Sequence, residues 1–89
     1  MEQILPHVRI GLDNDGRVIL VIEDSEVQDY IDDYLCEECD LDWEYFVPGQ
    51  TEAAPGTYYF PLSIQSNEIA AALRKISPAE IERIYRLNN

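Results

Sequence analysis

The sequence has no basic residues in its long middle part. Between Val18 and Leu73 there is no lysine or arginine, while eleven carboxylates fall between Glu23 and Glu44. Eighteen acidic residues against six basic ones give the 89-residue chain a formal net charge of −12. Such a chain is expected to avoid nucleic acid and anionic membranes and to attract basic proteins. The basic residues lie toward the two ends, at Arg9, Arg17, Arg74, Lys75, Arg83 and Arg86.

The motifs of common catalytic sites are also missing. The sequence contains no glycine-rich phosphate loop, no dinucleotide fingerprint and no recognisable Ser or Cys nucleophile motif, and His7 is its single histidine. Because carboxylates are so abundant, no pair of them stands out as a tuned acid and base. We therefore expect a protein that is not an enzyme and that needs no cofactor.

Export and membrane signals are absent too. The sequence begins with Met1, Glu2 and Gln3 and lacks a basic leader, and no apolar stretch is long enough for a signal peptide or a membrane span. These absences predict a cytoplasmic protein, in the host cytoplasm if a phage encodes it. Because a chain of this length has room for one core, we expect residues 1–89 to form a single acidic domain.

Two segments near the amino terminus predict a β-hairpin. Residues 7–12 alternate in polarity, residues 17–22 form a β-branched run, and the Asp-Asn-Asp-Gly segment 13–16 favours a tight turn. This segment does not fit a calcium loop, because its glycine would place the first and twelfth ligands on residues without side-chain oxygen. Since residues 18–22 are apolar on both faces, we expect a central strand with a helix on one side and further core or a partner on the other.

The longest helical pattern follows the hairpin. Ser25 is placed to be its N-cap, with Gln28 completing a capping box. The opposite face of this helix is acidic, and Asp32 and Asp33 are expected to point to solvent. The apolar face is expected to pack on the sheet and contains Val27, Tyr30, Ile31, Tyr34 and Leu35.

Two further strands and two further helices complete the predicted fold. The strands cover residues 43–47 and 57–62, and Pro61 either places the second of them at a sheet edge or ends it nearby. A helix capped at Ser66 extends through Ile76, and a last helix starts with the Ser-Pro pair that follows. The order β-β-α-β-β-α-α predicts an α+β fold with a mostly antiparallel four-stranded sheet and its helices packed on one face.

Cys36 and Cys39 form a Cys-x-x-Cys pair near the end of the acidic helix. Zinc needs about four ligands, and His7 is the only other soft ligand in the chain. The surrounding carboxylates disfavour the thiolate that a redox role needs. We expect a structural or incidental pair and no metal site, with a facultative disulfide or a metal shared between chains as the alternatives.

The acidic run from Glu23 to Glu44 is the best candidate for a functional surface. Solvated acidic faces often serve solubility alone, but such a surface normally mixes both signs of charge. A row of carboxylates on a rigid helix can instead imitate the phosphates of a nucleic acid and occupy a groove lined by lysine and arginine. The predicted partner-binding residues are Glu26, Asp29, Asp32, Asp33, Glu37, Asp40 and Asp42, with Trp43 as a candidate anchor.

These features lead to one functional hypothesis and one alternative. The hypothesis is a non-enzymatic inhibitor that blocks a basic surface of a nuclease, nucleic-acid-binding protein or nucleoprotein complex. In charge and size alone it has the character of phage anti-CRISPR and anti-restriction proteins and of nuclease immunity proteins. The alternative is a structural or adaptor protein that docks through an exposed aromatic edge strand, residues 57–60, with homodimer formation through that strand as a further expectation. Direct DNA binding by the last two helices is not expected, because helix-dipole complementarity accounts for Arg74 and Lys75.

Overall fold

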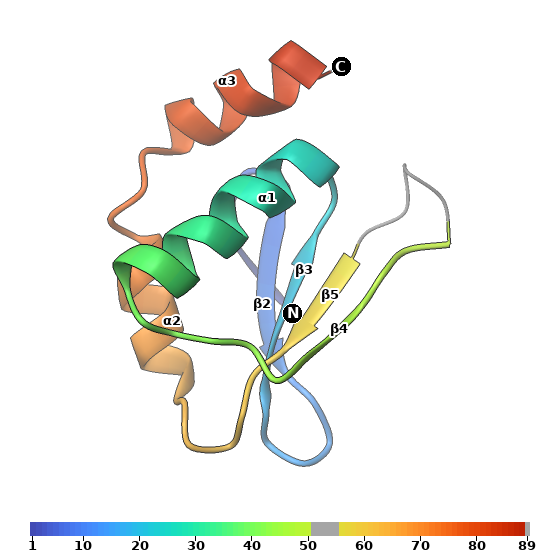
Figure 1. Ribbon diagram of the computed structural model, residues 1–89, viewed down its shortest axis with the longest axis vertical. Coiled ribbons are helices and arrows are strands. Elements are labelled where there is room, and N and C mark those ends of the chain that lie inside the picture. The colour runs from blue at the N-terminus through green and yellow to red at the C-terminus, as the bar shows by residue number, and fades with distance from the viewer. Residues whose placement is uncertain (51–55, 89) are drawn as a thin grey trace.

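The computed structural model describes residues 1–50 and 56–88, and Figure 1 shows their arrangement. Within these ranges five strands form one antiparallel sheet in the order β1-β2-β3-β5-β4. The fold is α+β, as predicted. The strands are β1 Glu2–Leu5, β2 Val8–Leu12, β3 Val18–Ile22, β4 Tyr45–Val47 and β5 Gly56–Tyr59. The helices are α1 Ser25–Asp33, its continuation as the π-helix η1 Tyr34–Glu38, α2 Ser66–Leu73 and α3 Pro78–Asn88.

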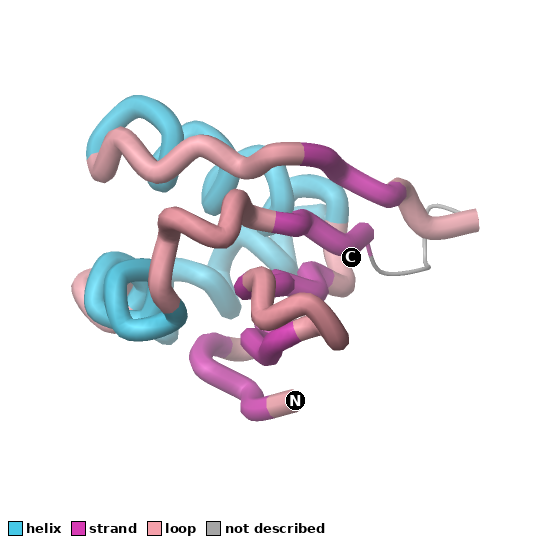
Figure 2. Tube along the Cα trace, turned by 90° about the horizontal axis from the view of Figure 1, so that it is seen from below, coloured by secondary structure: helices cyan, strands magenta, loops and turns pink. Residues whose placement is uncertain are grey.

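The helices cover one face of the sheet, as predicted, and Figure 2 shows them on one side of the stacked strands. β3 is the middle strand of the five, in agreement with its apolar sequence. No helix of residues 1–50 and 56–88 lies over the opposite face. The core lies between the sheet and the helices, where fully buried side chains include Leu20, Ile31, Phe60, Ile69 and Ile81.

The sheet has one strand more than the four predicted. The additional strand is β1, which pairs with β2 around a register shift between Gln3 and Leu5. Two polar residues followed by two apolar ones show no alternation, so the sequence carries no strand signal there. The connection to β2 is tight, and His7 takes a φ of 63° in it.

Strand β5 is not at an edge, which corrects the prediction drawn from Pro61. It pairs with β3 on one side and with β4 on the other. The strand ends at Tyr59, so the other predicted outcome, a strand that ends near Pro61, is confirmed. Because both edges of β5 are already paired, residues 57–60 cannot dock a partner or a second copy as a free edge. That form of the adaptor hypothesis, and homodimer formation through this strand, are wrong.

Helix α1 has a different cap from the one predicted. Asp24, and not Ser25, is the N-cap, and its carboxylate accepts hydrogen bonds from the backbone N–H groups of Glu26 and Val27, both at 3.1 Å. Asp24 is buried. A carboxylate at this position satisfies two free N–H groups and is favoured by the helix dipole.

Helix α2 also starts from a different residue. Gln65, and not Ser66, is the N-cap, and Oε2 of Glu68 accepts a hydrogen bond from the Gln65 N–H at 2.8 Å. The helix ends at Leu73, before the predicted end. Helix α3 begins at Pro78, as the Ser-Pro pair predicts.

Candidate functional site: an acidic ridge

Exposed carboxylates follow one another along α1, η1 and the segment after them, and we call this surface the acidic ridge. Those at positions 26, 29, 33 and 37 recur at helical spacing, so they lie on one side of the helix. Neither α1 nor η1 has a basic residue in its last turn. The ridge consists of Glu26, Asp29, Asp33, Glu37, Glu38, Asp40 and Asp42, all of them exposed.

The charge of the ridge is not neutralised by the described part of the chain. None of the ridge carboxylates forms an ion pair with a residue in 1–50 or 56–88. Arginines pair with acids elsewhere instead. These pairs are Arg9 with Glu23, Arg17 with Asp13, Asp15 and Glu44, Arg83 with Glu80, and Arg86 with Glu82.

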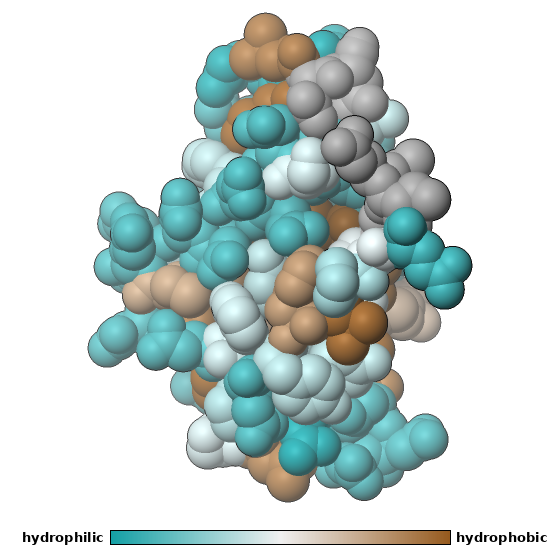
Figure 3. Space-filling view, turned by 45° about the vertical axis from the view of Figure 1, so that its right-hand side comes forward, coloured by the Kyte–Doolittle hydropathy of each residue, from teal (hydrophilic) through white to brown (hydrophobic). Residues whose placement is uncertain are grey.

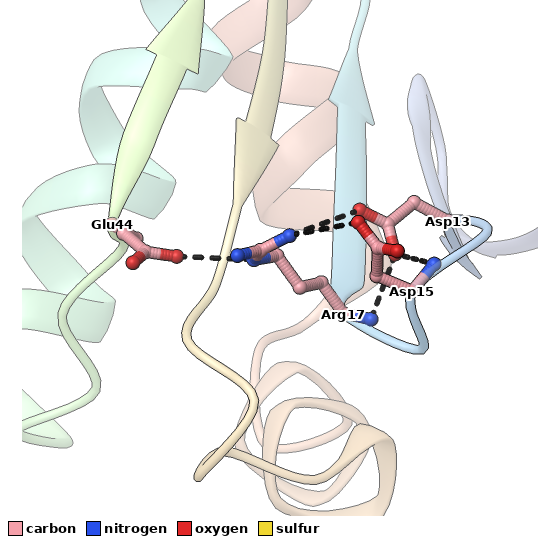
Figure 4. A network of polar contacts seen from close by, with 4 residues as sticks. All are labelled: Asp13, Asp15, Arg17 and Glu44. Carbon is pink, nitrogen blue, oxygen red and sulfur yellow. Dashed lines mark hydrogen bonds and ion pairs between the residues drawn. The ribbon is translucent and has the colours of Figure 1, made fainter.

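The largest of these ion-pair networks lies off the ridge, at the β2–β3 turn (Figure 4). Nη1 of Arg17 is 3.2 Å from Asp15 and 3.9 Å from Asp13. Nε of Arg17 donates to Oε2 of Glu44 at 3.1 Å, and this hydrogen bond raises the pKa of Arg17 above its ordinary value. Asp13 Oδ1 also accepts the N–H groups of Asp15 and Arg17, and Gly16 has a φ of 88°. The predicted hairpin turn is therefore confirmed.

Asp32 is not part of the ridge, although its neighbour Asp33 is. Asp32 Oδ1 accepts hydrogen bonds from Trp43 Nε1 at 2.9 Å and from Cys36 Sγ at 3.3 Å. Asp32 Oδ2 accepts a third from the hydroxyl of Tyr58 at 3.1 Å. The prediction that Asp32 points to solvent is wrong, because these three donors hold its carboxylate against β5 and the segment before β4. Asp33 is exposed, as predicted.

Trp43 is held in place by the same cluster. Its ring is tilted against Tyr58, with centroids 5.5 Å apart, and against Phe46, with centroids 6.4 Å apart. The indole N–H is bonded to Asp32, yet Trp43 remains 36% exposed. The residue predicted as an anchor is therefore a fixed, partly exposed aromatic side chain beside the ridge.

The ridge contains one carboxylate that was not among the predicted partner-binding residues. Glu38 lies five residues after Asp33, a separation that brings side chains together in a π-helix but not in an α-helix. The change to π geometry at η1 therefore adds Glu38 to the ridge, and the sequence gives no signal for it. Glu38 also lines a surface hollow of ≈ 350 Å³, together with Tyr30, Asp33, Tyr34 and Glu37.

Asp40 has a structural role as well as a place on the ridge. It takes the left-handed conformation, with a φ of 58°, directly after Cys39, the C-cap of η1. The N–H of Leu41 then donates to the carbonyl of Leu35 at 2.9 Å, which closes the helix end. Aspartate tolerates this conformation better than most residues, because its short side chain can bond locally.

The two cysteines have different neighbours. Burial raises the pKa of the Cys36 thiol to about 12, with further contributions from hydrogen bonds to Asp32 and Asp42. Cys39 lies beside Tyr34, whose pKa is raised by burial and by that thiol. Both cysteines are free. Among the residues that the structure describes, no group of three or more His, Cys, Asp or Glu side chains is placed to hold a metal ion.

The single histidine connects the β1–β2 turn to helix α3. Nε2 of His7 lies 2.8 Å from Oε1 of Glu82, and the imidazole stacks on Tyr85 with centroids 3.7 Å apart. Both contacts are made to residues far along the chain, so His7 contributes to the packing of the last helix and lies apart from the ridge.

Comparisons with known proteins add no relative. No family model, curated protein or solved structure matches the chain. In the described ranges, no helix is both long enough and apolar enough to cross a membrane. The acidic ridge is the surface on which a functional proposal can rest.

Proposed function

We propose that the protein is a non-enzymatic inhibitor whose acidic ridge binds and blocks a basic, nucleic-acid-binding surface of another protein. The observation that carries the proposal is that no ridge carboxylate has an ion pair with a described residue. Like charges along one helix oppose folding, and acids near its C-terminus are also disfavoured by the dipole. A partner rich in lysine and arginine removes this repulsion when it binds.

The spacing of the ridge suits imitation of a phosphate row. Carboxylates four residues apart, such as those of Asp29, Asp33 and Glu37, repeat every ~6 Å along a helix axis. One strand of a duplex carries one charge per ~3.4 Å, so the row offers about half that linear density. The remaining ridge acids, Glu38, Asp40 and Asp42, widen it into a surface, which a lysine- or arginine-lined groove can contact from several sides.

Aromatic side chains beside the ridge supply the anchors that an interface needs. Tyr30 and Trp43 are each 36% exposed, and Tyr30 lines the hollow together with Tyr34. The hydroxyl of Tyr34 donates to the carbonyl of Ala72 at 2.9 Å, which fixes the ring. An arginine or lysine side chain of the partner that enters the hollow meets both ring surfaces and carboxylates.

The experiment is a capture from a nuclease-treated lysate of the source cells with three forms of the tagged protein. The test variant carries Asp29→Asn, Asp33→Asn and Glu37→Gln, which keep side-chain shape and remove three charges. The control carries Ser63→Lys, Asn67→Lys and Ala71→Lys at exposed positions off the ridge, which change the net charge equally. We expect the wild type and the control to retain a basic partner that elutes with salt, and the test variant to lose it.

Competition then separates inhibition from simple binding. Nucleic acid added to the captured complex is expected to displace the partner, because both occupy the same basic surface. If the test variant and the control lose the partner equally, net charge and not the ridge governs binding, and the proposal is wrong. A partner that binds nucleic acid and this protein at the same time would also contradict it.

A further inference from the structure

The face of the sheet without helices carries its own group of apolar side chains. On β3, Val18, Leu20 and Ile22 are buried toward the helices, so Ile19 and Val21 point to the other side. Residues paired across antiparallel strands share a face, which extends this group over β4 and β5. We call the resulting surface the open face, made of Met1, Ile19, Val21, Tyr45, Val47, Thr57 and Tyr59.

The open face is aromatic where β4 meets β5. The rings of Tyr45 and Tyr59 stack with centroids 4.5 Å apart and planes 14° from parallel. Tyr45 is 42% and Val47 47% exposed. Met1 lies over Gly11, where an added Cβ would come within 3.0 Å of Met1 Cγ. Figure 3, which turns the right-hand side of Figure 1 forward, shows brown and pale side chains grouped among teal ones on this side of the molecule.

Charges of both signs border the open face, in contrast to the ridge. At one end of the strands Arg9, which is paired with Val21 and so lies on the same face, is 3.4 Å from Glu23. At the other end Arg17 is shared by three carboxylates, among them Asp15, whose side chain is 72% exposed. The first end is balanced and the second has an excess of acid. A second copy of a chain with net charge −12 is repelled by most of the surface, but not by this border.

We propose that the open face binds a second copy of the chain, sheet against sheet. Two copies related by a two-fold axis that runs across the strands bring opposite ends of β2 and β3 together. Arg9 of one copy then faces Asp15 of the other, and Glu23 faces Arg17, so that opposite charges meet. The apolar side chains between them form the buried centre, as in a β-sandwich.

Pairing of sheet edges is a poorer way for two copies to associate. The edge strand β4 has three residues and is followed by Pro48, and the edge strand β1 contains a register shift and is followed by Pro6. Short, interrupted edges next to proline resist the addition of another strand. The face, and not an edge, is therefore the surface that a second copy fits.

Sedimentation equilibrium of the full chain tests the proposal. The wild type is expected to shift from the monomer mass of 10.3 kDa toward twice that value as concentration rises. Val47→Lys should raise the dimer dissociation constant about tenfold or more, because it places an unpaired charge among the apolar side chains of the open face. Leu87→Lys, at a leucine that is 76% exposed on α3, is the matched control and should leave dimerisation unchanged.

A charge exchange tests the orientation of the two copies. Arg9→Glu and Asp15→Arg should each weaken the dimer, and the double variant should restore it, because the exchanged charges face each other across the interface. A wild type that stays monomeric at all concentrations, equal effects of Val47→Lys and Leu87→Lys, or a double variant weaker than either single one would each overturn the proposal. Since the ridge lies elsewhere, the inhibitor proposal does not depend on the result.

Discussion

The acidic ridge and the open face differ in whether their charged side chains form ion pairs. On the ridge, the carboxylates of Asp29, Asp33 and Glu37 have no ion pair within the described ranges, whereas around the open face Arg9 and Arg17 each contact acids. The chain is strongly acidic, and two of its six bases, Arg9 and Arg17, pair with acids at the border of the sheet, while the ridge has no ion pair within the described ranges. A high net charge therefore does not make all of the surface acidic to the same degree, and the inhibitor proposal rests on the part without ion pairs.

The two sides of helix α1 differ just as clearly. Asp33 faces solvent, while Asp32 accepts three hydrogen bonds and is part of the packing between α1 and the sheet. Two aspartates next to each other in the sequence thus belong to different surfaces. Three sets of variants test these differences between the surfaces.

The largest effect is expected in the reactivity of Cys36, in a Cys39→Ser background. With a pKa of about 12 the folded thiol has far less thiolate at pH 8 than a free cysteine, so alkylation should be slower than in urea by about two orders of magnitude. The stability that the protonated thiol contributes is present below its ordinary pKa of 9.0 and is lost as the pH rises toward 12. Equal alkylation rates in the folded and unfolded chain would show that the Cys36 thiol is not shielded by the fold.

The next largest effect is a difference in stability between variants of the neighbouring residues Asp32 and Asp33. Asp32→Ala leaves the hydroxyl of Tyr58 and the indole N–H of Trp43 without their acceptor, and should lower the free energy of unfolding by about 2 kcal/mol. Asp33→Ala removes only a repulsive charge and should leave stability unchanged or slightly higher. Urea denaturation of both variants measures the difference, and similar losses in the two would contradict the assignment of Asp33 to the ridge.

The smallest expected effect is a change in the free energy of unfolding that has opposite signs for variants on the ridge and at the border of the open face. Glu37→Gln should raise the free energy of unfolding by about 0.3 kcal/mol, because it relieves repulsion near a helix end. Glu44→Gln should lower it, because it removes the negative charge that pairs with Arg17, whose Nε lies 3.1 Å from Oε2 of Glu44. Thermal denaturation at low salt should show the two shifts in opposite directions, and both should shrink as salt is added. Shifts of the same sign would remove the contrast between the two regions.

The parts of the fold that the sequence predicted have strong local signals. The Asp-Asn-Asp-Gly turn and the Ser-Pro start of α3 depend on neighbours in the chain, and both are where the sequence placed them. The central position of β3 follows from its apolar residues on both faces. Local patterns of this kind identify elements, because the forces that form them act within a few residues.

The parts that could not be predicted depend on distant residues. β1 has no pattern of its own and forms by pairing with β2, and β5 lies inside the sheet because β4 adds to it. Asp32 is drawn inward by Tyr58, which is 26 residues away. Glu38 joins the ridge only because the helix changes to π geometry. Six of the seven ridge acids could still be predicted, because four of them recur at helical spacing and Asp40 and Asp42 follow in the same acidic run.

The most direct measurement is an NMR titration of the isotope-labelled chain with a short oligoarginine peptide at low salt. If the ridge is the cation-binding surface, backbone amide shifts should concentrate between residues 26 and 43, spare residues 9–23 and 57–59, and disappear in the variant with Asp29→Asn, Asp33→Asn and Glu37→Gln. Shifts that are spread over all acidic residues, or that centre on the border of the open face, would contradict it.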